Sequence, residues 1–93
     1  MVEILTKVGV ENGLPLDVAR GLASQTCLGA GSMLIGNEDE SPEEFRRKVT
    51  SPNGTTQAGI DKMINLGIQD VFSKGVEAAI AKSKELGSSL GKL

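Results

Sequence analysis

Histidine, tryptophan and tyrosine are absent from this 93-residue chain, which has a single cysteine and only two phenylalanines. Without histidine the chain lacks the commonest general base and metal ligand, and one cysteine cannot form a zinc site. We therefore expect no metal site, and any chemistry must rest on hydroxyls, carboxylates, lysines or backbone amides. The core must be built from Leu, Ile, Val, Met and Ala. A lone domain of this size is marginally stable, which favours a partner subunit.

The charge pattern excludes several classes of partner. The net charge is −2 and no face is obviously basic, so we expect no nucleic-acid binding. No apolar run approaches the roughly 18 residues of a membrane span, so we expect no membrane partner. The start, Met1–Ile4, lacks the basic and apolar stretches of a signal peptide. Because Cys27 cannot form an internal disulfide, we expect a soluble protein in the reducing cytoplasm.

Apolar residues recur at helical spacing along most of the chain, and no stretch alternates apolar and polar residues as a half-buried strand would. The pattern predicts an all-α fold of about five helices, with residues 1–87 as one helical domain and residues 88–93 as a frayed tail. The predicted helices span about Val2–Asn12, Pro15–Ile35, Pro42–Lys48, a start within Gly54–Thr56 to Leu66, and Ile68–Leu86.

The boundaries of these helices rest on short-range signals. Gly13 and Gly67 stand where a glycine with positive φ commonly ends a helix. Ser41 and Glu44 have the spacing of a capping box around Pro42.

The second predicted helix has almost no polar face. From Gly21 to Ile35 it carries no charged residue, and many of its residues are small. A helix that is apolar all round is normally buried all round, and each interior glycine costs roughly 1 kcal/mol relative to alanine. Close packing against another helix would offset that cost. Because 93 residues supply too few other helices, we predict a homodimer, formed through this helix and the fifth.

The polar loop Ser51–Thr56 is the candidate site, and two interpretations stay open for it. A helix that starts near Gly54–Thr56 presents free backbone N–H groups and the positive end of its dipole, to which the hydroxyls of Ser51, Thr55 and Thr56 can add. This arrangement would bind a small anion. Alternatively, the loop is a Pro-Asn-Gly turn followed by a threonine N-cap, which requires no ligand.

Four sequence elements, in order, resemble the C-terminal dimerisation domain of pyrroline-5-carboxylate reductases. Gln25–Ala30 resembles the family's Q-T-x-x-G-A element, and Val49–Thr56 resembles its T-S-P-G-G-T-T signature. Gly67 with Val76–Ala79 resembles a third element, and Gly13–Pro15 resembles the entry to its long helix. Asn53 departs from the pattern, since the family usually has glycine there. Asparagine is the next most tolerant residue of positive φ, so the turn can survive.

The resemblance implies two interlaced helical domains, each joined to a Rossmann domain that binds NADPH or NADH. By that analogy Ser51 and the amides of Gly54 and Thr55 hold the carboxylate of 1-pyrroline-5-carboxylate, and the Thr56 hydroxyl contacts the ring nitrogen. Hydride transfer from the nicotinamide to the cyclic imine then gives proline. The resemblance assigns no catalytic residue beyond these contacts, and leaves a larger assembly of dimers open.

The 93 residues contain no strand–glycine loop–helix unit. We therefore interpret the chain as the dimerising and substrate-binding half of such an enzyme, inactive alone and with no bound cofactor of its own. The alternative is a non-catalytic helical dimer that serves as an assembly module. The intact Ser51–Thr56 loop favours the first interpretation.

Overall fold

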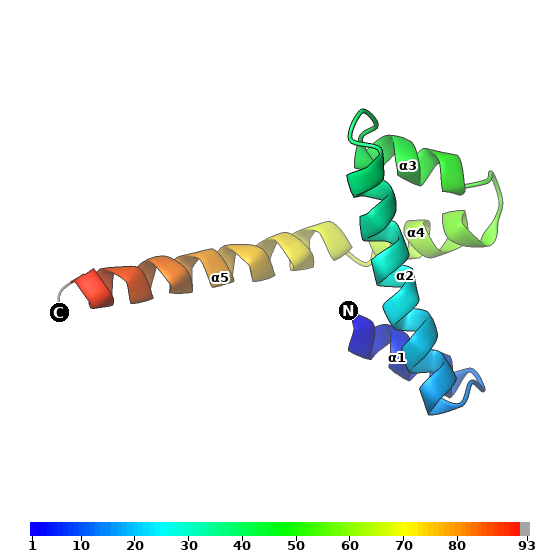
Figure 1. Ribbon diagram of the computed structural model, residues 1–93, viewed down its shortest axis with the longest axis horizontal. Coiled ribbons are helices and arrows are strands. Elements are labelled where there is room, and N and C mark those ends of the chain that lie inside the picture. The colour runs from blue at the N-terminus through cyan, green and yellow to red at the C-terminus, as the bar shows by residue number, and fades with distance from the viewer. Residues whose placement is uncertain (92–93) are drawn as a thin grey trace. The chain divides into compact units, whose positions relative to one another are not determined.

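The computed structural model describes residues 1–91, with side chains described up to Ser88. Every regular element in this part of the chain is an α-helix, which confirms the predicted all-α class (Figure 1). The helices are α1 (Val2–Glu11), α2 (Leu16–Gly36), α3 (Pro42–Val49), α4 (Thr55–Asn65) and α5 (Ile68–Gly91). The chain divides into two compact units, Met1–Lys48 and a second that begins at Val49.

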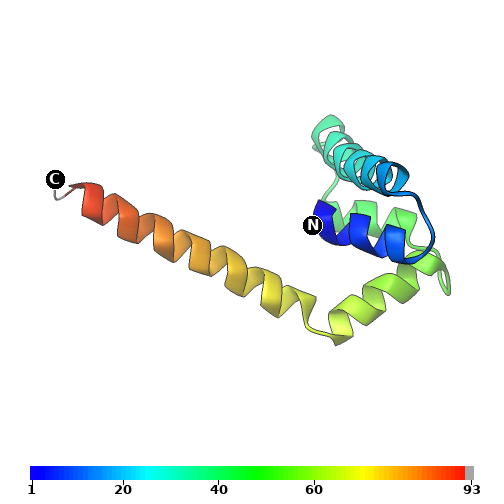
Figure 2. The same ribbon diagram turned by 90° about the horizontal axis from the view of Figure 1, so that it is seen from below.

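In the first unit, α1 packs against the N-terminal part of α2 (Figures 1 and 2). The turn between them is a Schellman motif. Gly13 takes a φ of 101°, its N–H donates to the Val10 carbonyl, and the Leu14 N–H donates to the Gly9 carbonyl, both at 3.0 Å. The predicted helix end at Gly13 is thereby confirmed.

Close approach between α1 and α2 depends on a small residue in each helix. A Cβ added at Gly9 would lie 3.1 Å from the Cβ of Ala19, tighter than most such contacts. Ala19 and Ala23 are 3% and 5% exposed, and they are the buried residues of the described chain. The hairpin is therefore held at a short distance by a glycine–alanine contact.

Local interactions fix both ends of α3. The Ser41 hydroxyl accepts a hydrogen bond from the Glu44 N–H at 3.2 Å, which confirms the predicted N-cap. Lys48 pairs with Glu40 and its ammonium lies 5.8 Å from the centre of the Phe45 ring. The basic end of α3 has the sign that the helix dipole favours.

In the second unit, α4 and α5 meet at a sharp bend (Figure 2). Gly67 makes the bend with a φ of 89°, and its N–H donates to the Ile64 carbonyl at 3.0 Å, as the sequence predicted. The fifth helix runs past Leu86, its predicted end, to Gly91. An interior glycine at position 87 costs about 1 kcal/mol against alanine, which is too little to end a helix without a proline or a left-handed turn. The boundary between domain and tail at residue 87 stays a prediction, and residues 92 and 93 of that tail lie outside the described residues.

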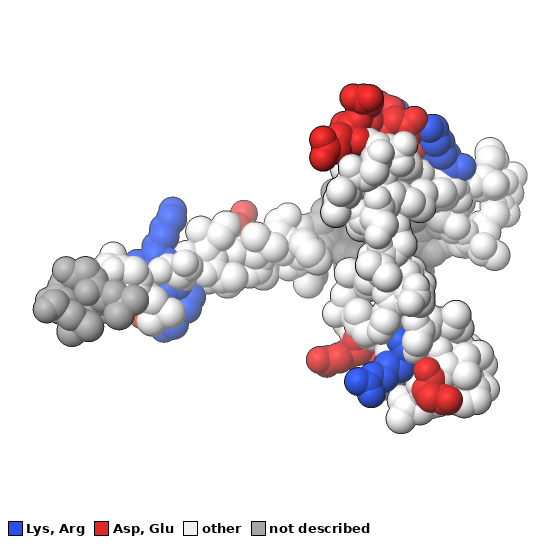
Figure 3. All heavy atoms as spheres, in the orientation of Figure 1, with Lys and Arg blue, Asp and Glu red and all other residues white. Residues whose placement is uncertain are grey.

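Large apolar side chains remain exposed on the helices of both units. Leu28 in α2 is 61% exposed and Phe72 in α5 is 65% exposed. Met63 and Ile64 in α4 are 49% and 54% exposed. Figure 3 shows the charged side chains of the first unit gathered at the two ends of α2, with an uncharged stretch between them. The residues that the structure describes therefore form helices with very few buried side chains.

Candidate functional site

The candidate site lies at the start of α4, in the second unit. Pro52 and Asn53 are the central residues of a tight turn, which the Gly54 N–H closes by donating to the Ser51 carbonyl at 3.0 Å. Asn53 has a φ of 61°, as expected for the third residue of a type II turn. The predicted turn is confirmed, and with it the tolerance of asparagine where positive φ is required.

Gly54 is the N-cap of α4. Its backbone is extended, with φ −89° and ψ −179°, and its carbonyl accepts the Ala58 N–H at 3.2 Å. A Cβ added here would lie 3.1 Å from the Ser51 carbonyl oxygen, so the close turn favours glycine on steric grounds. Gly54 has no side chain with which to cap this end of the helix. Thr55 and Thr56 both lie inside the first turn, so the cap residue is Gly54 and not a threonine. Whether the loop binds an anion or is a turn without a ligand stays a prediction.

The first turn of α4 determines what the site can bind. The backbone N–H groups of Thr55, Thr56 and Gln57 precede the first intrahelical hydrogen bond, so they are donors without a partner inside the helix. The sequence from Val49 to Ile60 contains no ionisable side chain. The positive end of the helix dipole is consequently the main local charge, and it attracts an anion.

The predicted contact residues are thus brought together by one short turn. Ser51 and Gly54 are its first and last residues, and Thr55 and Thr56 follow directly in α4. Ser51, Thr55 and Thr56 are exposed. Gln57 is held by its own hydrogen bond to the Asp61 carboxylate at 2.7 Å. The arrangement offers amides and hydroxyls on one side of a helix end, which suits a carboxylate and does not suit a metal.

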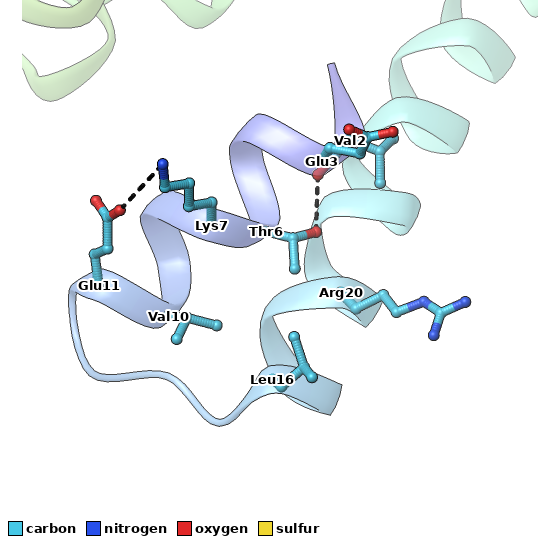
Figure 4. Close-up of a pocket in the computed structure, with 8 residues that line it drawn as sticks. All are labelled: Val2, Glu3, Thr6, Lys7, Val10, Glu11, Leu16 and Arg20. Atoms are coloured by element: carbon cyan, nitrogen blue, oxygen red, sulfur yellow. Dashed lines mark hydrogen bonds and ion pairs between the residues drawn. The ribbon is translucent and has the colours of Figure 1, made fainter.

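An open groove that was not predicted from the sequence lies in the first unit, between α1 and α2 (Figure 4). Its volume is about 480 Å³. Its lining residues are Val2, Glu3, Thr6, Lys7, Val10, Glu11, Leu16 and Arg20. Lys7 pairs with Glu11 at 4.0 Å on a well-exposed helix face, and no catalytic pair converges in the groove. The sequence feature that could have indicated this groove is the series of charged residues spaced one helical turn apart in α1.

Residues 1–86 match the family model described as pyrroline-5-carboxylate reductase dimerisation. The chain belongs to the pyrroline-5-carboxylate reductase dimerisation family. It is 37% identical to pyrroline-5-carboxylate reductase 1 of Bacillus spizizenii over 99% of the chain and 31% of that protein. The chain therefore spans about a third of the length of the curated relatives that it matches.

Solved structures of the same family have the same fold. The 1-pyrroline-5-carboxylate reductase of Streptococcus pyogenes superposes with a TM-score of 0.83 at 36% identity, over 90% of this chain and 32% of that one. The Plasmodium falciparum pyrroline carboxylate reductase, solved with NADP bound, gives a TM-score of 0.84 at 30% identity, over 92% of this chain and 34% of that one. None of the helices in residues 1–91 is both long and apolar enough to cross a membrane.

The positive φ of Asn53 leads to a prediction about substitutions at this position. Asn53→Gly should leave the melting temperature nearly unchanged, because both residues tolerate positive φ. Asn53→Val should lower the free energy of unfolding by about 1–2 kcal/mol, because a β-branched residue is strained there. Thermal unfolding followed by circular dichroism measures both variants. Equal stability of the valine variant would show that the turn is not held at positive φ in solution.

Proposed function

We propose that this chain is the dimerising and substrate-binding part of a pyrroline-5-carboxylate reductase, which reduces 1-pyrroline-5-carboxylate to proline. The observation that carries the proposal is the glycine-capped start of α4, which lies in the segment that resembles the family's signature loop. The substrate has a carboxylate, and the first-turn N–H groups of a helix can donate to such an anion. Ser51 and the amides of Gly54 and Thr55 would hold this carboxylate.

Thr56 has a different role in the proposal. Its hydroxyl is on the first turn of α4, next to the amides that would bind the carboxylate. A five-membered ring is small, so a carboxylate held by those amides would keep the ring nitrogen within reach of a first-turn hydroxyl. The charge on that nitrogen changes as the imine becomes an amine. A hydrogen bond there would orient the ring and stabilise one protonation state.

We expect the described residues to form no site for a dinucleotide. Residues 1–91 contain helices and no strand, whereas a dinucleotide-binding unit needs a strand, a glycine-rich loop and a helix. NADPH or NADH would therefore be held outside this chain, by the nucleotide-binding part of a complete reductase. This chain would contribute substrate binding and orientation.

The assembly in the proposal is a homodimer in which the helical domains interlace, and dimers could build a larger assembly. The support is the family's dimerisation function together with the exposed apolar residues of α2 and α5. We place the protein in the cytoplasm, because the single cysteine cannot form an internal disulfide.

Calorimetric titration of the isolated chain with NADPH tests whether the cofactor binds outside this chain. We expect no saturable heat at micromolar cofactor and no reduction of pyrroline-5-carboxylate, because no dinucleotide unit is present. Fusion to the nucleotide-binding domain of a relative should restore both NADPH binding and the reduction of pyrroline-5-carboxylate. Saturable NADPH binding by the isolated chain would contradict the proposal. A fusion that binds NADPH and dimerises but reduces no imine would favour the alternative, a non-catalytic assembly module.

A further inference from the structure

The dipeptide Asn-Gly occurs twice in this chain, as Asn12-Gly13 and as Asn53-Gly54. Asparagine followed by glycine is the sequence most prone to spontaneous deamidation, because glycine has no side chain to shield its backbone nitrogen from the neighbouring amide. Both asparagines are exposed, and both lie in turns. The two positions therefore share the same chemistry, and the surroundings of each decide how fast it reacts.

Deamidation of an Asn-Gly pair begins when the glycine nitrogen loses its proton to solvent base and attacks the side-chain Cγ of the asparagine. The new N–Cγ bond closes a five-membered succinimide, the Cγ–Nδ2 bond breaks, and the leaving nitrogen takes a proton from water and departs as ammonia. Water then opens the ring, at Cγ to give aspartate or at the asparagine backbone carbonyl to give isoaspartate. Both the glycine nitrogen and the asparagine side chain must therefore be free to move.

Asn12 is fixed at both of these groups. Its side-chain Nδ2 donates to the Val8 carbonyl at 2.8 Å. The Gly13 N–H donates to the Val10 carbonyl at 3.0 Å, and the N–H that follows it closes the same Schellman turn. Turning the Gly13 nitrogen toward Cγ would break the side-chain bond and both bonds of the turn.

Asn53 is held by fewer interactions. Within the described residues, its side-chain amide has no hydrogen-bond partner. The Gly54 N–H donates to the Ser51 carbonyl at 3.0 Å, and this bond closes the turn. Asn53 has a φ of 61°, a conformation that residues with a side chain rarely adopt, so opening the turn also relieves an unfavourable backbone geometry. Breaking one hydrogen bond therefore frees both reacting groups.

We propose that Asn53 is a site of spontaneous deamidation in the folded protein, and that Asn12, in the same dipeptide, is protected. Reaction at Asn12 requires two more hydrogen bonds to open than reaction at Asn53. At the usual net strength of such bonds, this difference corresponds to a rate ratio of about fivefold or more. A glycine at position 53, which the family usually has, could not react in this way.

The product has a new negative charge beside the candidate site. Position 53 directly precedes Gly54, the N-cap of α4, so a carboxylate there lies near the first-turn N–H groups that would bind the substrate. This consequence rests on the proposed function, whereas the deamidation itself does not. In a fusion to the nucleotide-binding domain of a relative, Asn53→Asp should raise KM for pyrroline-5-carboxylate by about twofold to fivefold, and added salt should reduce the increase. An unchanged KM would overturn the charge effect and leave the deamidation standing.

Peptide mapping by mass spectrometry tests the deamidation on the full chain. During incubation in mildly alkaline buffer below the melting temperature, the peptide with Asn53 should gain the mass of an amide-to-acid conversion about fivefold or more faster than the peptide with Asn12. In denaturant, where neither turn persists, the two peptides should convert at similar rates. Asn53→Gly should remove the mass gain from its own peptide and leave the rate at Asn12 unchanged.

Three results would overturn the proposal. The first is equal conversion of the two asparagines in the folded chain, or faster conversion at Asn12. The second is a folded chain in which neither asparagine converts over a time in which the denatured chain reacts. The third is a preference for Asn53 that persists unchanged in denaturant, because the sequence and not the turn would then set the rate.

Discussion

Replacing Thr56 by alanine should lower kcat/KM for imine reduction by about tenfold to a hundredfold, in a fusion of this chain to the nucleotide-binding domain of a relative. That range corresponds to the loss of one hydrogen bond to a charged group, roughly 1.5–3 kcal/mol. Because the proposed bond reaches the ring nitrogen, where charge changes during reduction, kcat should fall as well as affinity. Steady-state kinetics over a range of pyrroline-5-carboxylate concentrations separates the two effects.

Stability measurements distinguish this role from a structural one. Gly54 is the N-cap of α4, so Thr56→Ala removes no cap, and alanine is the better helix former. The melting temperature of the alanine variant should therefore stay level or rise slightly. Thr56→Ser keeps the hydroxyl and should keep most of the activity. Unchanged kinetics with a lower melting temperature would mean that Thr56 serves the helix and not the substrate.

Gly29→Leu should raise the dimer dissociation constant of the isolated chain by about fivefold to more than a hundredfold. A Cβ added at Gly29 meets nothing within 4 Å inside the chain, so a side chain at this position starts in open space. If a partner helix packs closely at this glycine, the added side chain costs about 1–3 kcal/mol through overpacking. Sedimentation over a concentration series measures the change.

The sign of the effect makes this substitution informative. For a helix with no partner, leucine or alanine in place of glycine would stabilise the chain by nearly 1 kcal/mol, because glycine is a poor helix former. A more stable, equally dimeric Gly29→Leu chain would therefore show that the surface at Gly29 lies outside the interface. Gly29→Ala is the matched control, since it adds helix propensity with the smallest increase in volume.

Much of the fold could be predicted from the sequence because its signals are local. The helix ends at Gly13 and Gly67 each depend on one residue with positive φ and a few backbone hydrogen bonds close by. The cap of α3 is a hydrogen bond between residues three positions apart, from the Glu44 N–H to the Ser41 hydroxyl. The end of α5 was predicted too early, at Leu86, because Gly87 weakens a helix without stopping it.

The candidate site was partly predictable for the same reason. Pro52 and Asn53 indicated the turn, and the following threonines indicated a helix start. The sequence did not decide which residue caps α4, since the segment Gly54–Thr56 is compatible with either a glycine or a threonine N-cap. The structure assigned the cap to Gly54, because the turn closes on its N–H and leaves both threonines inside the helix.

The sequence by itself determined the helices, their turns and the family, because these depend on residues within a few positions of one another and on ordered motifs. Only the tertiary structure showed that Gly9 meets Ala19, and that a groove lined by residues such as Lys7, Val10 and Arg20 lies between α1 and α2. The position of that groove depends on how the two helices are rotated against each other. The rotation is set by the close contact of small residues that lie ten positions apart in the chain, a distance over which local preferences specify nothing.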